Sequence, residues 1–252
     1  MPLPAGTPGQ YRFNVYACKA AGDCAARRSL PTPTPLYTVS RLGFGMNEAY
    51  KAFLRDRRFT PDNLESPCLF RGQVDDTEEM APEVYTGRGD YDECLGLVRK
   101  FVQAREDAGL YNNPDMSSLP PLNLDVDYFV TDNFPKVVIP ILEYNQKVEV
   151  GTRIHTISPK DLQSEARSIC AQPFDSVWEA LSETKATRRK KICFGAAYIT
   201  SLLDLYGFPG DMEFNFALEI NGIDMNWPLG AIIEQISAVA IEDIAESTHT
   251  EL

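Results

Sequence analysis

The fold of this chain is decided by two stretches of sequence, SICAQPFDSVW at residues 168–178 and CFGAAYITSLL at residues 193–203. An apolar run that begins at Leu162 follows one helical face up to Cys170, and Cys193 opens the second, apolar stretch. The pattern predicts two neighbouring helices that a Cys170–Cys193 disulfide would join. Closing this loop would stabilise the fold by about 3 kcal/mol on the chain-entropy model. Such a disulfide indicates an oxidising compartment.

Further predicted elements flank these two helices. Ser158 and Pro159 supply an N-cap and a first helical residue, which predicts a helix start. A strand, a glycine turn and a helix follow one another over residues 36–56, an order typical of an α/β unit, and one compact unit is expected. Helices are predicted at residues 46–56, 92–108, 174–181 and 192–206 and from Pro228 onward, and strands at residues 10–16, 36–40, 124–130 and 212–220.

Composition excludes some classes of function. The 252 residues are 44% hydrophobic and carry a formal net charge of −12. Nucleic-acid affinity depends on clustered Lys and Arg, so no nucleic-acid partner is expected. The one dense basic run, residues 188–191, is interpreted as a solvated helix start or loop without function.

No stretch approaches the roughly 20 apolar residues of a membrane span, so none is predicted. The first ten residues lack the apolar centre of a signal peptide, although the cysteine pattern is that of a secreted protein. We therefore expect the natural start to lie further upstream.

The remaining cysteines leave their pairing open. Cys18 and Cys24 lie close enough for a small disulfide loop, and this interpretation is favoured over a metal site because no His or second Cys pair is near. Cys68 and Cys94 complete an even count, but their connectivity cannot be deduced from sequence.

Standard catalytic constellations are largely excluded. The only histidines are His155 and His249, and His155 stands beside β-branched residues, which favours a structural role. The zinc-protease, P-loop and dinucleotide-binding motifs are absent from the sequence. The carboxylate run at residues 75–79 and the Arg-Gly-Asp tripeptide at residues 88–90 are interpreted as surface without function. No catalytic residue and no metal site are predicted.

Four segments, taken in order, resemble the C-terminal half of the apyrases, the nucleoside di- and triphosphate phosphohydrolases. They are YTVSRLGFGMNEA at residues 37–49, the cysteine segments at residues 66–68 and 91–94, the paired-cysteine helices at residues 168–203, and the segment at residues 223–232. The motif positions within them are Ser40, Gly43, Gly45, Trp227 and Gly230, and Trp227 is expected to pack at a helix start.

The resemblance implies the fold and the partners. It implies the C-terminal lobe of an actin-like, ribonuclease H-like α/β fold, a mixed sheet flanked by helices. Residues 1–35 would form a strand and a Pro-rich loop, residues 36–222 the base-binding lobe, and residues 223–252 a helix that returns to a missing N-terminal lobe. The partner would be a nucleoside di- or triphosphate in the secretory pathway lumen or outside the cell.

The resemblance also implies what this chain lacks. Enzymes of the family bind phosphates through glycine-rich loops, activate water with a Glu, and use Ca²⁺ or Mg²⁺. Such loops let backbone N–H groups approach phosphate oxygens, and this sequence contains none of them. The chain alone is therefore expected to hold no cation and to be inactive.

One base-binding position is implied at Tyr128, where the family carries a tyrosine that stacks on the nucleobase. A core aromatic is the alternative interpretation. The family's second stacking residue, an arginine, falls near Asp204 or Leu205, and Tyr206 could substitute for it. The rival hypotheses for the whole chain are a non-catalytic nucleotide-binding or interaction module of the same fold, and an unrelated disulfide-stabilised α/β domain.

Overall fold

The computed structural model describes residues 10–13, 34–37, 43–59, 63–75, 83–109, 128–148, 155–220 and 223–224. The chain divides into two compact units. The first comprises Met1–Leu42, Asn112–Pro114 and Pro228–Leu252, and the second comprises Gly43–Tyr111 and Asp115–Trp227. In the first unit, β1 (Gln10–Phe13) and β2 (Thr34–Tyr37) pair antiparallel, with Gln10 opposite Tyr37.

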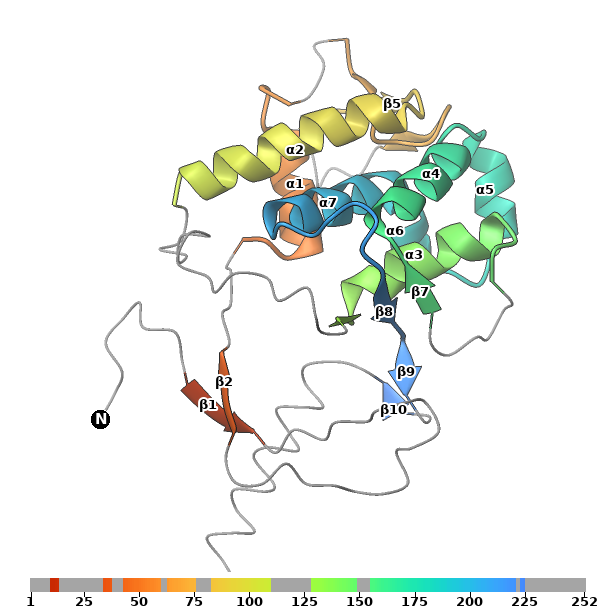
Figure 1. Cartoon of the computed structure of the whole chain (residues 1–252). Coiled ribbons are helices and arrows are strands. Elements are labelled where there is room, and N and C mark those ends of the chain that lie inside the picture. Colours follow the sequence, from red (N-terminus) through yellow and green to blue (C-terminus); the bar gives the residue numbers. More distant parts are fainter. Residues whose placement is uncertain are drawn as a thin grey trace, which may run out of the picture. The chain divides into compact units, whose positions relative to one another are not determined.

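The second unit is organised around one buried helix, α7 (Ile192–Leu205). Its sequence is apolar almost throughout, and most of its residues are buried because neighbouring helices cover it (Figure 1). Those that contact it are α1 (Met46–Arg55), α2 (Tyr91–Asp107), α3 (Asn133–Tyr144) and α4 (Pro159–Cys170). Two shorter helices, α5 (Phe174–Ala180) and α6 (Ala186–Arg189), lead into it.

Local signals set where the helices begin and end. The Ser158 hydroxyl accepts a hydrogen bond from the Asp161 N–H at 3.1 Å, so the predicted cap of α4 is confirmed. Asp90 caps α2 in the same way, through the Glu93 N–H at 3.0 Å. Gly207 follows α7 with a φ of 80°, a conformation that glycine adopts without strain.

The strands form small mixed sheets. In one, β5 (Tyr85–Gly87) pairs parallel with β3 (Glu65–Ser66) and antiparallel with β4 (Val74–Asp75). In another, β8 (Phe214–Phe216) pairs parallel with β6 (Phe129–Val130) and antiparallel with β7 (His155–Ile157). A separate pair joins β9 (Glu219–Ile220) to β10 (Ile223–Asp224). The architecture is thus mixed α/β, with helices and small sheets.

Aromatic rings fill the core of the second unit. The Phe53 ring lies 5.2 Å from Phe194 and 5.5 Å from Phe101, measured between centroids. Tyr91 and Thr200 hydrogen-bond through their hydroxyls at 3.2 Å, and burial raises the pKa of Tyr91 to about 12. These contacts join α1, α2 and α7 into one packed body.

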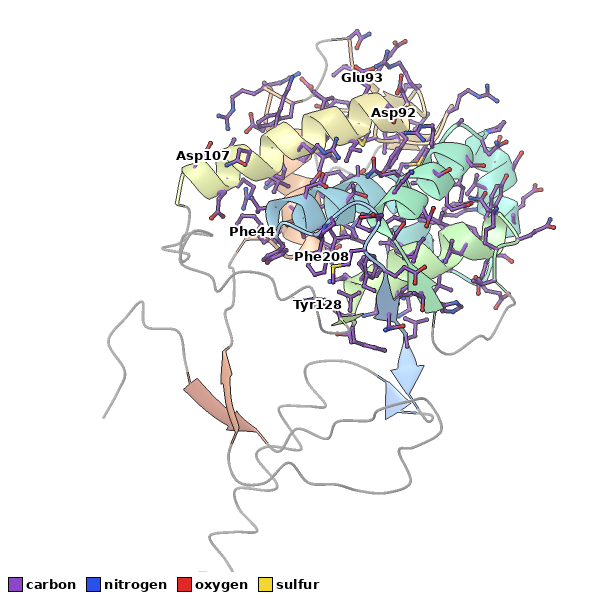
Figure 2. The ribbon with its side chains drawn as sticks, in the orientation of Figure 1. Phe44, Asp92, Glu93, Asp107, Tyr128 and Phe208 are labelled. Carbon is purple, nitrogen blue, oxygen red and sulfur yellow. A yellow bond between two sulfur atoms is a disulfide. The ribbon has the colours of Figure 1, made fainter. Side chains whose placement is uncertain are left out.

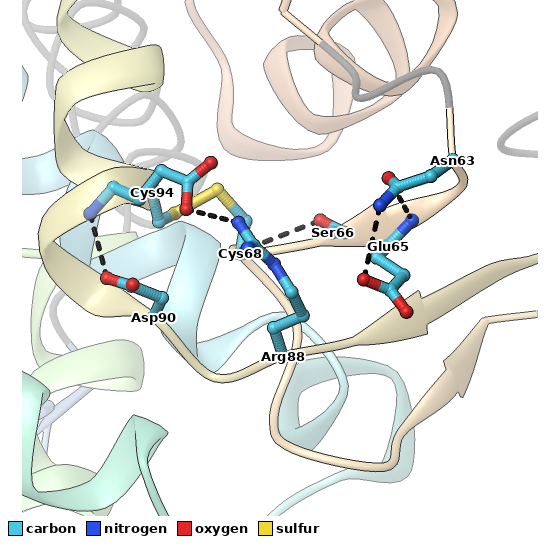
Figure 3. Close-up of polar contacts among 8 residues, drawn as sticks. Asn63, Glu65, Ser66, Cys68, Arg88, Asp90 and Cys94 are labelled. Atoms are coloured by element: carbon cyan, nitrogen blue, oxygen red, sulfur yellow. Dashed lines mark hydrogen bonds and ion pairs between the residues drawn. A yellow bond between two sulfur atoms is a disulfide. The ribbon is translucent and has the colours of Figure 1, made fainter.

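Two disulfides join elements of this body. Cys170 and Cys193 are bonded, with Cα atoms 5.7 Å apart, which confirms the predicted link between α4 and α7. Cys68 and Cys94 are also bonded, and Figure 3 shows this bond beside the capping contact of Asp90 at the start of α2. Cys18 and Cys24 lie outside the described residues.

The Arg-Gly-Asp tripeptide has structural roles. Asp90 is the cap of α2, and Arg88 forms an ion pair with Glu93 one turn into the helix. Gly89 has a φ of 71°, and a Cβ placed on it would lie 2.3 Å from the carbonyl oxygen of Cys170. Only glycine fits this close approach between the two disulfide-bonded segments.

Several sequence predictions differ from the structure. The strand predicted at residues 212–220 is divided into β8 and β9, and the strand predicted at residues 36–40 lies at Thr34–Tyr37. That shift brings Pro35 into β2, where it is tolerated because β2 pairs with one strand, β1. Helix α3 was missed, as was the small sheet of residues 65–87.

The basic run at residues 188–191 is only partly solvated, contrary to prediction. The Arg189 guanidinium lies 3.7 Å from the centre of the Trp178 ring, and Lys191 donates to the Asn47 side chain at 3.0 Å. His155, in contrast, is buried and stacked on Phe216, which confirms its structural role. Ser40, Trp227, Gly230 and the helix predicted from Pro228 lie outside the described residues. Among the described helices, none is both long and apolar enough to cross a bilayer.

Candidate functional site

An apolar cavity of about 710 Å³ opens at the C-terminal end of α7. Three separate segments line it: the turn before α1, the residues around β6 and the start of α3, and the end of α7 with the turn after it. Its lining side chains include Phe44, Tyr128, Thr131, Asp132, Tyr198, Tyr206 and Phe208. Its volume falls in the range of small-molecule sites.

Tyr128 is held at the cavity by backbone and ring contacts. The Tyr128 carbonyl accepts a hydrogen bond from the Asn215 N–H at 2.8 Å, which fixes the residue beside β8. Its ring packs edge to face on Phe208 with centroids 4.9 Å apart. Figure 2 shows Phe44, Tyr128 and Phe208 gathered below α7. Tyr128 is half-buried, so it belongs to the edge of the core and to the cavity wall.

The turn before α1 is anchored from two sides. The Tyr198 hydroxyl donates to the Phe44 carbonyl at 2.8 Å, and burial raises the pKa of Tyr198. Arg105 donates to the Gly43 carbonyl at 2.9 Å and places its guanidinium 5.8 Å from the centre of the Phe44 ring. Gly43 has a φ of 78°, which the turn requires, whereas a Cβ on Gly45 would meet open space.

Polar groups gather at one side of the cavity. Asp132 has a φ of 59° and a ψ of −109°, an unusual backbone conformation for a residue with a side chain. Its carboxylate pairs with Lys136 and accepts from the Asn133 side-chain amide at 3.0 Å. Thr131 lies next to it in the wall. The cavity can therefore hold a flat apolar group and hydrogen-bond its polar edge.

The second predicted stacking position also lies at this cavity. Tyr206 lines the wall and is 37% exposed, so its ring is accessible. Leu205 lines the wall as well, whereas Asp204 turns to α2 and accepts from the Arg99 guanidinium at 2.7 Å. The described residues of the wall include no Lys or Arg. Among these described residues, the side chains around Tyr206 are aromatic and aliphatic.

A divalent cation has no candidate ligand set in the part of the chain that the structure describes. Within that part, no three side chains of His, Cys, Asp or Glu converge closely enough to hold a metal ion. Asp132 stands alone among carboxylates in the described cavity wall, and it is paired with Lys136. The described residues thus do not fit a resident metal ion.

The sequence of the chain matches a known protein family. The sequence signature of the GDA1/CD39 (nucleoside phosphatase) family matches residues 32–248. The chain belongs to this family. The matched range includes all three segments that line the cavity.

Individual relatives of this nucleoside phosphatase family chain share about a quarter of their residues with it over the matched range. It is 23% identical over 181 residues to the Golgi apyrase of Schizosaccharomyces pombe, a match of 67% of the chain and 30% of that protein. It is 24% identical over 214 residues to ectonucleoside triphosphate diphosphohydrolase 6 of Mus musculus, a match of 81% of the chain and 41% of that protein. The chain thus matches less than half the length of these relatives.

The sequence located two cavity residues and missed others. Tyr128 and Tyr206 were singled out from the family resemblance, and the structure brings both to one wall. Phe44 and Phe208 were missed, although each stands beside a glycine that turns the chain, at Gly43 and Gly207. The sequence signal for both residues was an aromatic side chain next to a glycine in a turn. The sequence does not show, however, that these two turns lie at the same cavity.

Proposed function

We propose that this chain is the nucleobase-binding part of a nucleoside di- or triphosphate phosphohydrolase, and that the base binds in the apolar cavity. The observation that carries the proposal is that Tyr128 and Tyr206 line one cavity of about 710 Å³. Membership of a nucleoside phosphatase family supports the class of ligand. Aromatic stacking on a base contributes about 1–3 kcal/mol, so one well-placed ring strengthens binding about 5-fold to 150-fold.

The chemistry of the walls suits a base. Phe44, Tyr128 and Phe208 offer aromatic surface for the flat faces of the ring. Thr131 and Asp132 offer hydroxyl and carboxylate oxygens for the exocyclic and ribose donors. The cavity therefore has an aromatic part for stacking and a separate polar part for hydrogen bonds, as small-molecule sites commonly do.

We further infer that this part is the C-terminal lobe of an actin-like fold in the secretory pathway or outside the cell. The mixed sheets and flanking helices support the fold, and the two disulfides support the compartment. In the family, phosphate release depends on glycine-rich loops, a general base and Ca²⁺ or Mg²⁺. None of those loops occurs in the 252 residues, so we expect these residues alone to release no phosphate.

The test is calorimetric titration of the chain with a nucleoside and with a nucleoside diphosphate. Tyr128→Ala is expected to weaken both affinities by about 5-fold to 150-fold, the loss of one stacking contact. The matched control is Phe129→Ala, because Phe129 is the next residue, is 40% exposed, and does not line the cavity. Equal losses in the two variants would contradict the assignment of the cavity.

Hydrolysis is tested on the same material. The pure chain with Ca²⁺ or Mg²⁺ and ATP, ADP, GDP or UDP is expected to release no inorganic phosphate above the background rate. Cation-dependent turnover would show that the 252 residues hold their own catalytic machinery, while leaving the role of Tyr128 to the binding experiment.

A further inference from the structure

A second cleft, of about 540 Å³, is lined by basic side chains. Its cations come from three segments: α1, α3, and residues 185–191, which include the short helix α6 and end just before α7. They are Lys51, Lys136, Lys185, Arg188 and Lys191. No carboxylate is found among the described residues that line it. In a chain with a formal net charge of −12, this local excess of positive charge needs an explanation.

Neighbouring carboxylates neutralise only part of this charge. Lys136 pairs with Asp132, and Lys51 lies 3.3 Å from Glu48, but neither carboxylate lines the cleft. Lys191 donates to the uncharged Asn47 side chain at 3.0 Å. Each of these two ion pairs compensates one of the five cations, and the described residues of the lining itself carry no negative charge.

The side chains of the basic run before α7 point to two different places, the Trp178 ring and the cleft. Arg189 lies on the Trp178 ring at 3.7 Å and donates to the Trp178 carbonyl, which secures α6 against α5. Arg188 and Lys191, on either side of it, line the cleft. Since the contacts of Arg189 fix the backbone of this segment, Arg188 and Lys191 line the cleft from a fixed backbone.

Two helices also begin at this cleft. Met46 and Asn47 are the first residues of α1, and Asn133 is the first residue of α3. The positive end of a helix dipole favours a bound anion. The helix ends therefore add to the positive electrostatic potential of the cleft. The site itself is formed by the five basic side chains.

We propose that this cleft binds a small anion that carries two phosphate groups. A phosphate group carries about −1.5 to −2 at neutral pH, and a diphosphate can reach more of the five basic side chains than a single phosphate can. Lysine ammonium groups bind phosphate oxygens as point charges from several directions, and Arg188 adds a planar donor. The cleft shares Met46 and Asn133 with the apolar cavity, but binding of the anion does not require the base site.

The experiment titrates the intact 252-residue chain with inorganic pyrophosphate, and separately with sulfate at the same ionic strength. We expect pyrophosphate to bind at least about 10-fold more tightly than sulfate. The double variant Lys185→Ala/Arg188→Ala is expected to weaken pyrophosphate binding at least about 10-fold. The matched control, Lys100→Ala/Lys160→Ala, removes the same charge from exposed positions outside the cleft and is expected to change it less than 2-fold.

Two outcomes would overturn the proposal. Equal affinity for sulfate and pyrophosphate, or equal losses in the two double variants, would mean that the chain attracts anions only through its general field. Far-ultraviolet circular dichroism and the thermal midpoint of each variant establish that it is folded before it is titrated.

A further pair of titrations separates this site from the base site. Tyr128→Ala is expected to leave pyrophosphate affinity unchanged, and Lys185→Ala/Arg188→Ala is expected to leave nucleoside affinity unchanged. A loss of pyrophosphate affinity in Tyr128→Ala would overturn the anion site as an independent feature. Failure of the nucleoside to bind at all would count against the base site alone.

Discussion

The two ends of α7 lie in different surroundings. At its N-terminal end Cys193 is bonded to Cys170, and the fully buried Phe194 packs on Phe53 of α1. At its C-terminal end Leu205 and Tyr206 face a cavity, and Tyr206 is 37% exposed. One helix therefore serves as core at one end and as cavity wall at the other.

This difference teaches where stability and binding reside. Burial and cross-links stabilise a fold in proportion to the surface and chain entropy they remove. Accessible rings in a cavity contribute little to folding, because their contacts are completed only when a ligand enters. We therefore expect substitutions near the disulfides to change the free energy of unfolding, and substitutions of the exposed side chains at the cavity to change mainly affinity.

Among the largest expected effects is that of Gly89→Ala. A Cβ at this position would lie 2.3 Å from the Cys170 carbonyl oxygen, and the φ of 71° strains any residue with a side chain. We expect the free energy of unfolding to fall by about 3–4 kcal/mol, as measured by denaturant titration.

The control for this substitution is Gly96→Ala in α2. A Cβ there meets no atom within 4 Å, so alanine is expected to raise the free energy of unfolding by about 0.5–1 kcal/mol. A Gly89→Ala protein as stable as the Gly96→Ala protein would contradict the close approach between β5 and the end of α4.

Slightly smaller effects are expected when either disulfide is removed. The Cys170–Cys193 bond closes a separation of 23 residues and the Cys68–Cys94 bond one of 26. On the chain-entropy model each double substitution to alanine lowers the free energy of unfolding by about 3 kcal/mol, with little difference between the two. Denaturant titration of both double variants measures the losses. A clearly smaller loss at Cys170 and Cys193 would mean that packing alone secures the N-terminal end of α7.

The sequence predicted those helices whose ends are marked by a capping residue, a proline or a glycine. Ser158 and Pro159 mark the start of α4, and Gly207 marks the end of α7, because capping and left-handed backbone are local properties. The Cys170–Cys193 bond was predictable for the same reason, since each cysteine stands on a recognisable helix.

Other features depend on contacts that no local pattern reveals. Helix α3 contains Pro135 and Pro140, which disfavour a helix, yet both are buried in the core. Burial of the apolar face of α3 outweighs the lost backbone hydrogen bond. The family resemblance identified Tyr128 and Tyr206, but their meeting in one cavity follows from the pairing of β6 with β8. The basic cleft was missed because its cations come from three separate segments.

The smallest expected effect on stability is that of Tyr206→Ala at the cavity end of α7. A side chain that is 37% exposed loses less buried surface than a fully buried one, so we expect the free energy of unfolding to fall by about 1–2 kcal/mol. Tyr198→Ala is the matched comparison, because it changes the same residue type on the same helix and at the same cavity. Tyr198 is 1% exposed and its hydroxyl donates to the Phe44 carbonyl, so its loss is expected to cost about 3–5 kcal/mol. Denaturant titration compares the two, and equal losses would mean that Tyr206 is part of the packed core, which would remove the contrast between the two ends of α7.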